Sequence, residues 1–205
     1  EWRKLGVIAG GGELPVVLAE HLAATQRPYF IARVEGMADP ALEAHPGGAH
    51  GLGALGARMD ALRDAGCDAV VLIGQVSRPD LSTLQLDAVA QAMLPTLLAA
   101  WKQVDDAVLR ALLAAHEKAG LRVVGVEEAM SDLLAPAGPW GKVQPNAAQQ
   151  RDIKRAAQVA AAVGSFDIGQ GVVVCAGIVL TVEAQEGTDA MLRRVGELPL
   201  TVRGS

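Results

Sequence analysis

The stretch Asp68-Ala-Val-Val-Leu-Ile-Gly74 decides the fold class of this chain. Its apolar residues follow one another without the alternation of a strand that has one face in water. Such a run is typical of a strand in a parallel sheet that is covered by helices on both faces. The run Leu5-Gly-Val-Ile-Ala9 has the same character, and Gly10-Gly-Gly12 ends it. We therefore expect these two segments to be central strands of one sheet.

Helical and strand patterns alternate on either side of the two runs. Strands are predicted over 29–34 and 121–126, and helices over 13–24, 58–65, 84–101 and 105–119. Residues 36–56 are a Gly- and Pro-rich stretch to which no element is assigned. This order indicates βαβ units, which place the strands parallel and the helices on both faces. The sequence predicts an α/β fold with an N-terminal, Rossmann-like, doubly wound domain over 1–134.

A second, smaller domain is expected over 140–205. Residues 135–141 are rich in Pro and Gly, so they mark the boundary. Asn146 is the expected N-cap of a helix to about 163, and strands over 172–175 and 178–184 form a hairpin at Ala176-Gly177. Thr188 or Asp189 is expected to cap a last helix over 190–195. Two strands have too little sheet to cover their own apolar faces, so this α/β domain is predicted to be thin.

Composition excludes several classes of protein. The chain has 205 residues, 51% hydrophobic residues and a net charge of −5, so disorder and non-specific nucleic-acid binding are not expected. The sequence shows neither an apolar run of spanning length nor a signal peptide. Cys67 and Cys175 lie in apolar stretches and are expected to be buried free thiols. We therefore expect a cytoplasmic protein.

Gly10-Gly-Gly12 lies between a strand and the start of a helix, where backbone N–H groups and the helix dipole favour an anion. Three glycines would let a phosphate approach the backbone closely. The alternative is a tight turn without a ligand. The dinucleotide fingerprint G-x-G-x-x-G is not met, because its last position is Pro15.

Two further polar segments follow predicted strands in this domain. Gln75 and Arg78 come directly after the strand at 69–73, where ligands bind in open α/β sheets, and Arg78 could hold a phosphate with two hydrogen bonds. A solvated arginine in a turn is an equal alternative. Asp105 and Asp106 open a helix, where they could cap it, hold Mg²⁺ or bind a sugar.

In the second domain, Gly169-Gln-Gly171 and Glu186-Gly-Thr-Asp189 flank the two predicted strands. The second group concentrates carboxylates, a hydroxyl and a glycine at a strand-to-helix turn, although surface turns often have this composition. The four histidines have no metal-ligand spacing, and His21 and His116 are expected near the surface.

Taken together, these segments resemble the metal-dependent UDP-2,3-diacylglucosamine pyrophosphatases of the lipid A pathway. The matching stretches are Lys4 to Pro15, Leu62 to Pro79, Asp105-Asp106 with Leu109-Arg110, Gly141-Lys-Val143 and Asp167 to Leu192. They cover nearly the whole chain in order. This family serves bacteria that lack the calcineurin-like enzyme for the same step.

The resemblance implies two α/β domains with the substrate between them and Mg²⁺-assisted hydrolysis to UMP and 2,3-diacylglucosamine 1-phosphate. The acyl chains imply work at the inner face of the cytoplasmic membrane, and a homo-oligomer is compatible with the family. Asp189 and Glu186 are the catalytic candidates. The substrate-binding candidates are Gly10, Gly11, Gly12, Gln75, Arg78, Asp105, Asp106, Lys142, Gln170, Gly171, Gly187 and Thr188.

The chain also departs from the family pattern. Val104 replaces a glycine before the paired aspartates, and Leu55 and Ala57 stand where the family carries Phe and Lys. The expected essential Asp of the family lies beyond residue 205. The resemblance therefore implies that the chain is C-terminally truncated, that its second α/β domain is incomplete, and that the 205 residues have little activity by themselves. Two alternatives therefore stay open: a non-catalytic binding protein for a nucleotide sugar or lipid phosphate, and a nicotinamide-dependent oxidoreductase.

Overall fold

The computed structural model describes residues 2–76, 84–101, 106–135, 137–139 and 141–204. The chain divides into two units, Glu1–Ala135 and Pro136–Ser205, and each is described by itself.

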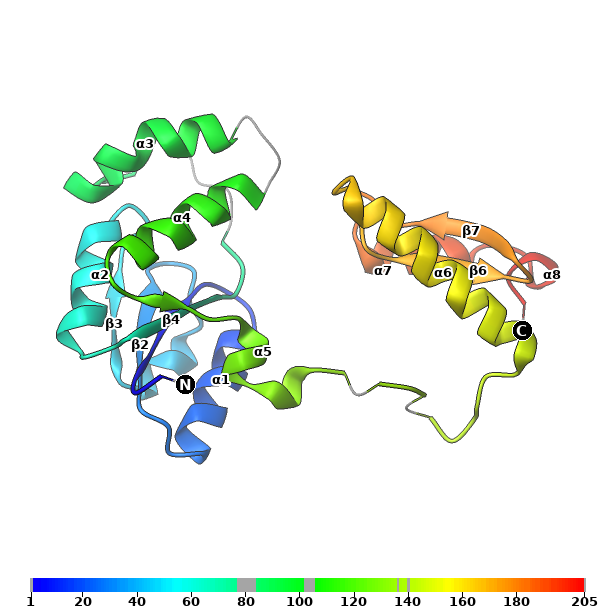
Figure 1. Cartoon of the computed structure of the whole chain (residues 1–205), viewed down its shortest axis with the longest axis horizontal. Coiled ribbons are helices and arrows are strands. Elements are labelled where there is room, and N and C mark those ends of the chain that lie inside the picture. The colour runs from blue at the N-terminus through cyan, green and yellow to red at the C-terminus, as the bar shows by residue number, and fades with distance from the viewer. Residues whose placement is uncertain (1, 77–83, 102–105, 136, 140, 205) are drawn as a thin grey trace. The chain divides into compact units, whose positions relative to one another are not determined.

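Five parallel strands form the sheet of the first unit, in the order β3-β2-β1-β4-β5 (Figure 1). They are β1 (Leu5–Ala9), β2 (Tyr29–Val34), β3 (Gly47–His50), β4 (Ala69–Ile73) and β5 (Arg122–Val123). Val7 of the central strand pairs with Ile31 on one side and with Val71 on the other. Both apolar runs of the sequence analysis are therefore inner strands, which explains why they lack polar alternation.

Helices cover both faces of this sheet, as a doubly wound fold requires. On one face, α1 (Leu14–Ala24), the 3-10 helix η1 (Pro40–Ala44) and α5 (Val126–Ala129) pack against alternate strand residues such as Val7 and Val71; η2 (Ser131–Leu133) follows α5. On the other face, Leu62 of α2 (Leu55–Asp64) packs against Ile8 and Val70. Helices α3 (Ala88–Trp101) and α4 (Asp106–Lys118) join α2 in a further apolar cluster. The predicted α/β class and doubly wound architecture are confirmed.

The Gly- and Pro-rich stretch over 36–56, to which the sequence assigned no element, contains η1 and strand β3. Strand β3 reads Gly-Gly-Ala-His, which has no β-branched or aromatic residue and therefore no strand signal. A Cβ at Gly47 would lie 2.0 Å from the carbonyl oxygen of Ile31, so the close approach of the two strands requires glycine. Helix α3 begins at Ala88 rather than at residue 84.

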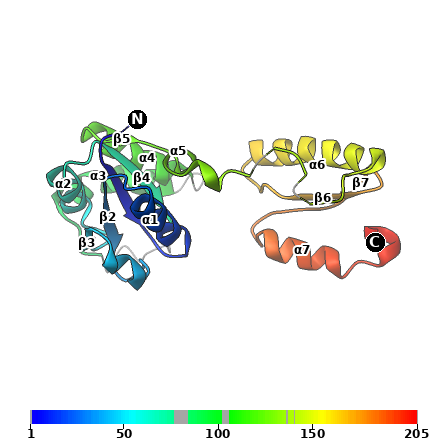
Figure 2. The same ribbon diagram turned by 90° about the horizontal axis from the view of Figure 1, so that it is seen from below.

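The second unit contains a two-stranded antiparallel sheet of β6 (Val172–Cys175) and β7 (Ile178–Val182). Helix α6 (Ala147–Ser165) and helix α7 (Thr188–Gly196) lie on opposite sides of this hairpin (Figures 1 and 2), and α8 (Leu200–Arg203) follows. Asn146 caps α6, as predicted, and forms a reciprocal capping box with Gln149. The predicted cap of α7 is wrong: the N-cap is Gly187, whose φ of +79° favours glycine.

The described residues include no helix that is long and apolar enough to cross a membrane.

Candidate functional site

The strand order of the first sheet reverses between β1 and β4. Strand β1 connects outward to β2 on one side, whereas β4 and β5 continue the sheet on the other side. In open α/β sheets, ligands bind in the crevice outside the carboxyl ends of the strands at such a switch point. Two predicted segments end these strands, Gly10-Gly-Gly12 after β1 and Gly74-Gln75 after β4. The topology therefore brings them to one point at the carboxyl edge.

The backbones of these two segments bind each other. The Gly11 N–H donates to the Gln75 carbonyl at 2.8 Å, and the Gln75 N–H donates to the Gly11 carbonyl at 2.8 Å. The Gly10 N–H donates to the Ile73 carbonyl at 2.9 Å. The predicted role of Gly10 and Gly11 as backbone donors to a ligand is therefore revised, because both N–H groups already have partners in the sheet.

The close approach of the two segments explains two of their glycines. A Cβ at Gly10 would lie 2.4 Å from the Gln75 carbonyl oxygen. A Cβ at Gly74 would lie 2.7 Å from the Gly11 oxygen and 2.7 Å from Cγ of Pro15. These positions require glycine for packing, whatever the ligand.

Gly12 keeps the properties that an anion site needs. Its φ is +92°, a Cβ built on it would meet no atom within 4 Å, and the residue is exposed. Helix α1 begins two residues later, and its first N–H groups have no helical partner. Glu13 stands at the N-cap without a side-chain capping bond, so its carboxylate would oppose an anion placed there. The backbone N–H groups that this loop can offer to an anion are thus those of residues 12–14.

The remaining candidates of the first unit fall in different places. Gln75 is exposed at the carboxyl edge of the sheet, next to the bridge. Arg78 and Asp105 lie outside the described residues. Asp106 is the first residue of α4, and the structure describes its backbone only.

The two catalytic candidates of the second unit lie around the start of α7. An ion pair joins Glu186 to Arg194 at 2.9 Å, and the Arg194 guanidinium also donates to the Thr181 hydroxyl and to the Val182 carbonyl. Asp189 is exposed in the first turn of α7, where a negative charge stabilises the helix dipole. Both carboxylates therefore have a structural role, an ion pair for Glu186 and a helix start for Asp189. Their catalytic role stays a prediction.

Sequence reasoning missed Glu183, an acid directly after β7. The side chain is 6% exposed, and Oε1 accepts a hydrogen bond of 2.8 Å from the hydroxyl of Thr188. Among the residues that the structure describes, its Oε2 has no hydrogen-bond partner. The strand alternation could have revealed the burial of Glu183, because this residue lies two positions after the buried Thr181 and therefore on the same face.

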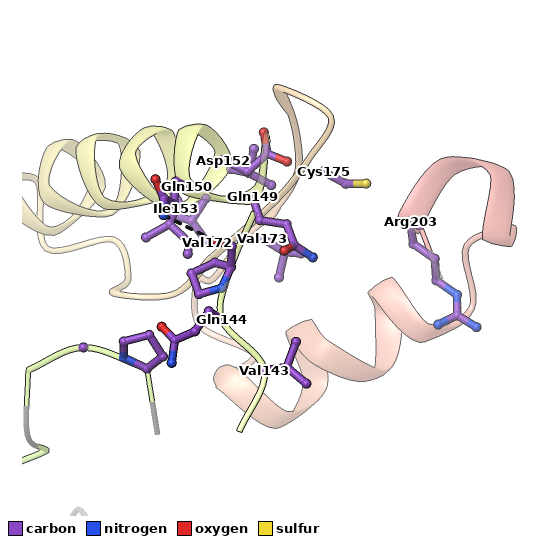
Figure 3. Close-up of a pocket in the computed structure, with 16 residues that line it drawn as sticks. Val143, Gln144, Gln149, Gln150, Asp152, Ile153, Val172, Val173, Cys175 and Arg203 are labelled. Atoms are coloured by element: carbon purple, nitrogen blue, oxygen red, sulfur yellow. Dashed lines mark hydrogen bonds between the residues drawn. The ribbon is translucent and has the colours of Figure 1, made fainter. Parts of the chain in front are cut away.

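Lys142 and Gln170, the other candidates of this unit, are exposed. A hollow of about 1180 Å³ in this unit lies elsewhere (Figure 3). Val172, Val173 and Cys175 of β6, Gln149 and Ile153 of α6, and Arg203 line it, with segment 143–145. None of the predicted site residues lines this hollow, and its wall is largely apolar.

Two basic side chains that the sequence did not reveal as buried are Arg58 of α2 and His116 of α4. Arg58 is 5% exposed, and its Nε and one Nη have no hydrogen-bond partner in the described part of the chain. Burial lowers the pKa of Arg58, while the charge of Asp87 raises it. His116 was expected near the surface, and this prediction is wrong: it is 1% exposed and its Nδ1 lies 2.7 Å from the Leu112 carbonyl. Its aliphatic neighbours gave no sign of which helix face turns inward.

The described residues do not assemble a ligand set for Mg²⁺, which prefers several oxygen ligands around one point. Among them, no group of three or more His, Cys, Asp or Glu side chains converges. Glu186 and Asp189, the catalytic candidates by sequence, stand apart as an ion-paired acid and a helix-terminal acid. Mg²⁺ stays a prediction from the family resemblance.

The doubly wound sheet, its glycine segments at the switch point and the small hairpin unit define an α/β protein of the Rossmann-like class. Two family models match the chain: the LpxI N-terminal domain over residues 4–133 and the LpxI C-terminal domain over 136–204. The chain belongs to the LpxI family. A relative from Caulobacter vibrioides, named UDP-2,3-diacylglucosamine pyrophosphatase LpxI, is 50% identical over 202 residues, which are 98% of this chain and 72% of that protein.

A solved structure titled a putative NAD-dependent epimerase/dehydratase from Methylobacillus flagellatus is 15% identical, with a TM-score of 0.33. The match covers 78% of this chain and 50% of that one. A TM-score of this size does not establish a shared fold.

Proposed function

We propose that this protein hydrolyses the pyrophosphate of UDP-2,3-diacylglucosamine to UMP and 2,3-diacylglucosamine 1-phosphate in lipid A biosynthesis. The observation that carries the proposal is family membership along both units, with 50% identity to a relative of that name. We place the reaction in the cytoplasm, at the inner face of the membrane that holds the acylated substrate.

The reaction balances with one water molecule. The water oxygen bonds to the phosphorus nearer the sugar, and the bond from that phosphorus to the bridging oxygen breaks. UMP leaves with the bridging oxygen, and the water oxygen remains in the sugar phosphate. Such a displacement needs positive charge or N–H donors around the phosphoryl oxygens and a group that orients the water.

The described residues supply parts of this requirement. Backbone N–H groups at residues 12–14 and in the first turn of α7 are available to phosphate oxygens. Glu186 and Asp189 stand beside the second of these helix starts and are the candidates to orient the water. A bound Mg²⁺ would supply charge neutralisation and a polarised water, and we propose it as a requirement that removal of the metal can test.

The test is UMP release from UDP-2,3-diacylglucosamine by the complete gene product that contains these 205 residues, with Mg²⁺ or with EDTA. We expect turnover with Mg²⁺, its loss with EDTA, and ¹⁸O from labelled water in the lipid product alone. A protein that binds the lipid product but releases no UMP would instead be a binding protein. A change in nicotinamide absorbance upon addition of substrate would indicate an oxidoreductase.

A further inference from the structure

Glu183 connects two segments of the second unit that are far apart in sequence. Its backbone N–H donates to the Gly171 carbonyl at 2.8 Å, and its Oε1 accepts the Thr188 hydroxyl at 2.8 Å. One residue therefore ties the Gly169-Gln-Gly171 segment to the first residue of α7.

The two glycines of that segment make room for Glu183. A Cβ at Gly171 would lie 2.6 Å from Oε2 of Glu183, and a Cβ at Gly169 would lie 2.2 Å from its carbonyl oxygen. The Gly171 site also borders the buried Met191, whose Cε would lie 3.0 Å from the added Cβ. The carboxylate is thus enclosed between backbone and an apolar side chain.

This enclosure is costly. Glu183 is 6% exposed, and Oε2 has no hydrogen-bond partner among the described residues. Burying a carboxylate oxygen without a donor costs on the order of 1–3 kcal/mol or more. An apolar residue would avoid that cost, so stability alone does not account for an acid at this position.

The consequence for Thr188 is a fixed direction of its hydroxyl proton. A threonine hydroxyl has one proton to donate, and here it is donated to Glu183. The lone pairs of the Thr188 oxygen are then left to accept a hydrogen bond. The backbone N–H groups at the start of α7 have no helical acceptor and can serve an anion.

We propose that Glu183 is a positioning residue for the start of α7. It orients Thr188 so that the threonine oxygen accepts a hydrogen bond from a hydroxyl or amide N–H of the substrate's acylated sugar. The backbone N–H groups at the start of α7 then contact the phosphate. This inference rests on the proposed hydrolysis and assigns the chemistry by which one segment of the chain recognises the sugar.

The experiment compares Glu183→Ala, Thr188→Val, their double variant and the conservative Thr188→Ser. Glu197→Gln, which changes an exposed acid at the end of the same helix, is the matched control. We expect Glu183→Ala and Thr188→Val each to raise KM about ten-fold, the value of one hydrogen bond to substrate, with a smaller change in kcat. Thr188→Ser should keep KM near the wild-type value. The double variant should lose no more than either single variant, since Glu183 acts on the substrate only through Thr188.

Two outcomes would overturn the inference: a KM for Glu183→Ala equal to that of Glu197→Gln, or single losses that multiply in the double variant. A purely structural role would lower the melting temperature without changing KM, so unfolding is measured for every variant. Absence of turnover in the wild type would count against the proposed hydrolysis instead. In that case hydrogen exchange at residues 187–191 decides the positioning: faster exchange in Glu183→Ala than in Glu197→Gln supports it, and equal rates reject it.

Discussion

Asp152, in the second turn of α6, accepts the backbone N–H of Gly177 at 2.7 Å through Oδ1. Its Oδ2 accepts the N–H of Ala176 at 2.9 Å, so one carboxylate holds both residues of the β6–β7 turn. Ala176 has a φ of +49°, which is unfavourable for alanine and needs support from its surroundings. The hairpin and the helix are therefore joined by a charge-assisted pair of hydrogen bonds, which are stronger than neutral ones.

Asp152→Ala should consequently destabilise the second unit by about 2 kcal/mol, the typical value for hydrogen bonds to a charged group. Urea unfolding monitored by hydrogen exchange of the hairpin amides measures this loss. Glu197→Ala removes an exposed acid from the same unit and should change stability by less than about 0.5 kcal/mol. Equal stability of the two variants would mean that the turn does not depend on Asp152.

Gly10→Ala should destabilise the first unit by about 2–3 kcal/mol, because the new Cβ would stand 2.4 Å from the Gln75 carbonyl oxygen and force the two segments apart. Gly196→Ala is the matched control, since a Cβ there meets nothing within 4 Å. Thermal unfolding of both variants checks the difference. If Gly10→Ala kept wild-type stability but lost substrate binding, the glycine would serve the ligand rather than the packing.

Asp68 should make the first unit sensitive to acid. Its carboxylate accepts the backbone N–H groups of Lys4 and Arg3, and these bonds lower the pKa from 3.8 to about 2. A lowered pKa means that the stabilisation is fully present above the unfolded value near 3.8 and is lost as the pH falls through about 2. Asp68→Asn should therefore cost about 1–2 kcal/mol at neutral pH and almost nothing near pH 2.

Urea titrations of Asp68→Asn and wild type between neutral pH and about pH 2 measure this convergence. Asp64→Asn, which changes an exposed acid at the end of α2, provides the comparison. A constant difference between Asp68→Asn and wild type over that range would show that the carboxylate charge is not what matters.

Buried His116 and half-buried His50 predict a second pH effect, at higher pH. Burial lowers the pKa of His116 and of His50 below the ordinary value of 6.5, and the charge of Arg58 lowers both further. The unfolded state therefore binds protons that the folded state excludes, and stability should fall as the pH drops below 6.5, by up to about 1.4 kcal/mol per pH unit for each histidine.

His116→Asn removes one of these titrations and should reduce the slope of stability against pH below about 6.5. Circular dichroism during urea unfolding at several pH values measures that slope. An unchanged slope in both His116→Asn and His50→Asn would contradict the assignment.

The order of the inner elements could be predicted because their signals are local. The unbroken apolar runs of β1 and β4 and the Asn146 cap of α6 each carry their meaning within a few residues. Strand β3 could not be predicted, because Gly47 owes its place to a carbonyl of β2 and not to any propensity of its own.

The candidate site shows the same limit. The sequence indicated that Gly171 contacts the ligand. In the structure, the atom nearest to a Cβ at Gly171 is a carboxylate oxygen of Glu183, twelve positions further along the chain. The burial of Glu183 and of His116 depends on which way a strand residue or a helix face turns. Composition does not record that direction, as the Ala and Leu residues that precede His116 illustrate.

The paired hydrogen bonds between Gly11 and Gln75 also have a kinetic meaning. Because each residue is both donor and acceptor to the other, neither amide can reach solvent unless the whole bridge opens. The two amides should thus share one opening rate in hydrogen exchange, although they lie 64 positions apart in the chain. The segments after β1 and β4 should therefore move together, and a displacement of either segment at the carboxyl edge of the sheet should shift the start of α1.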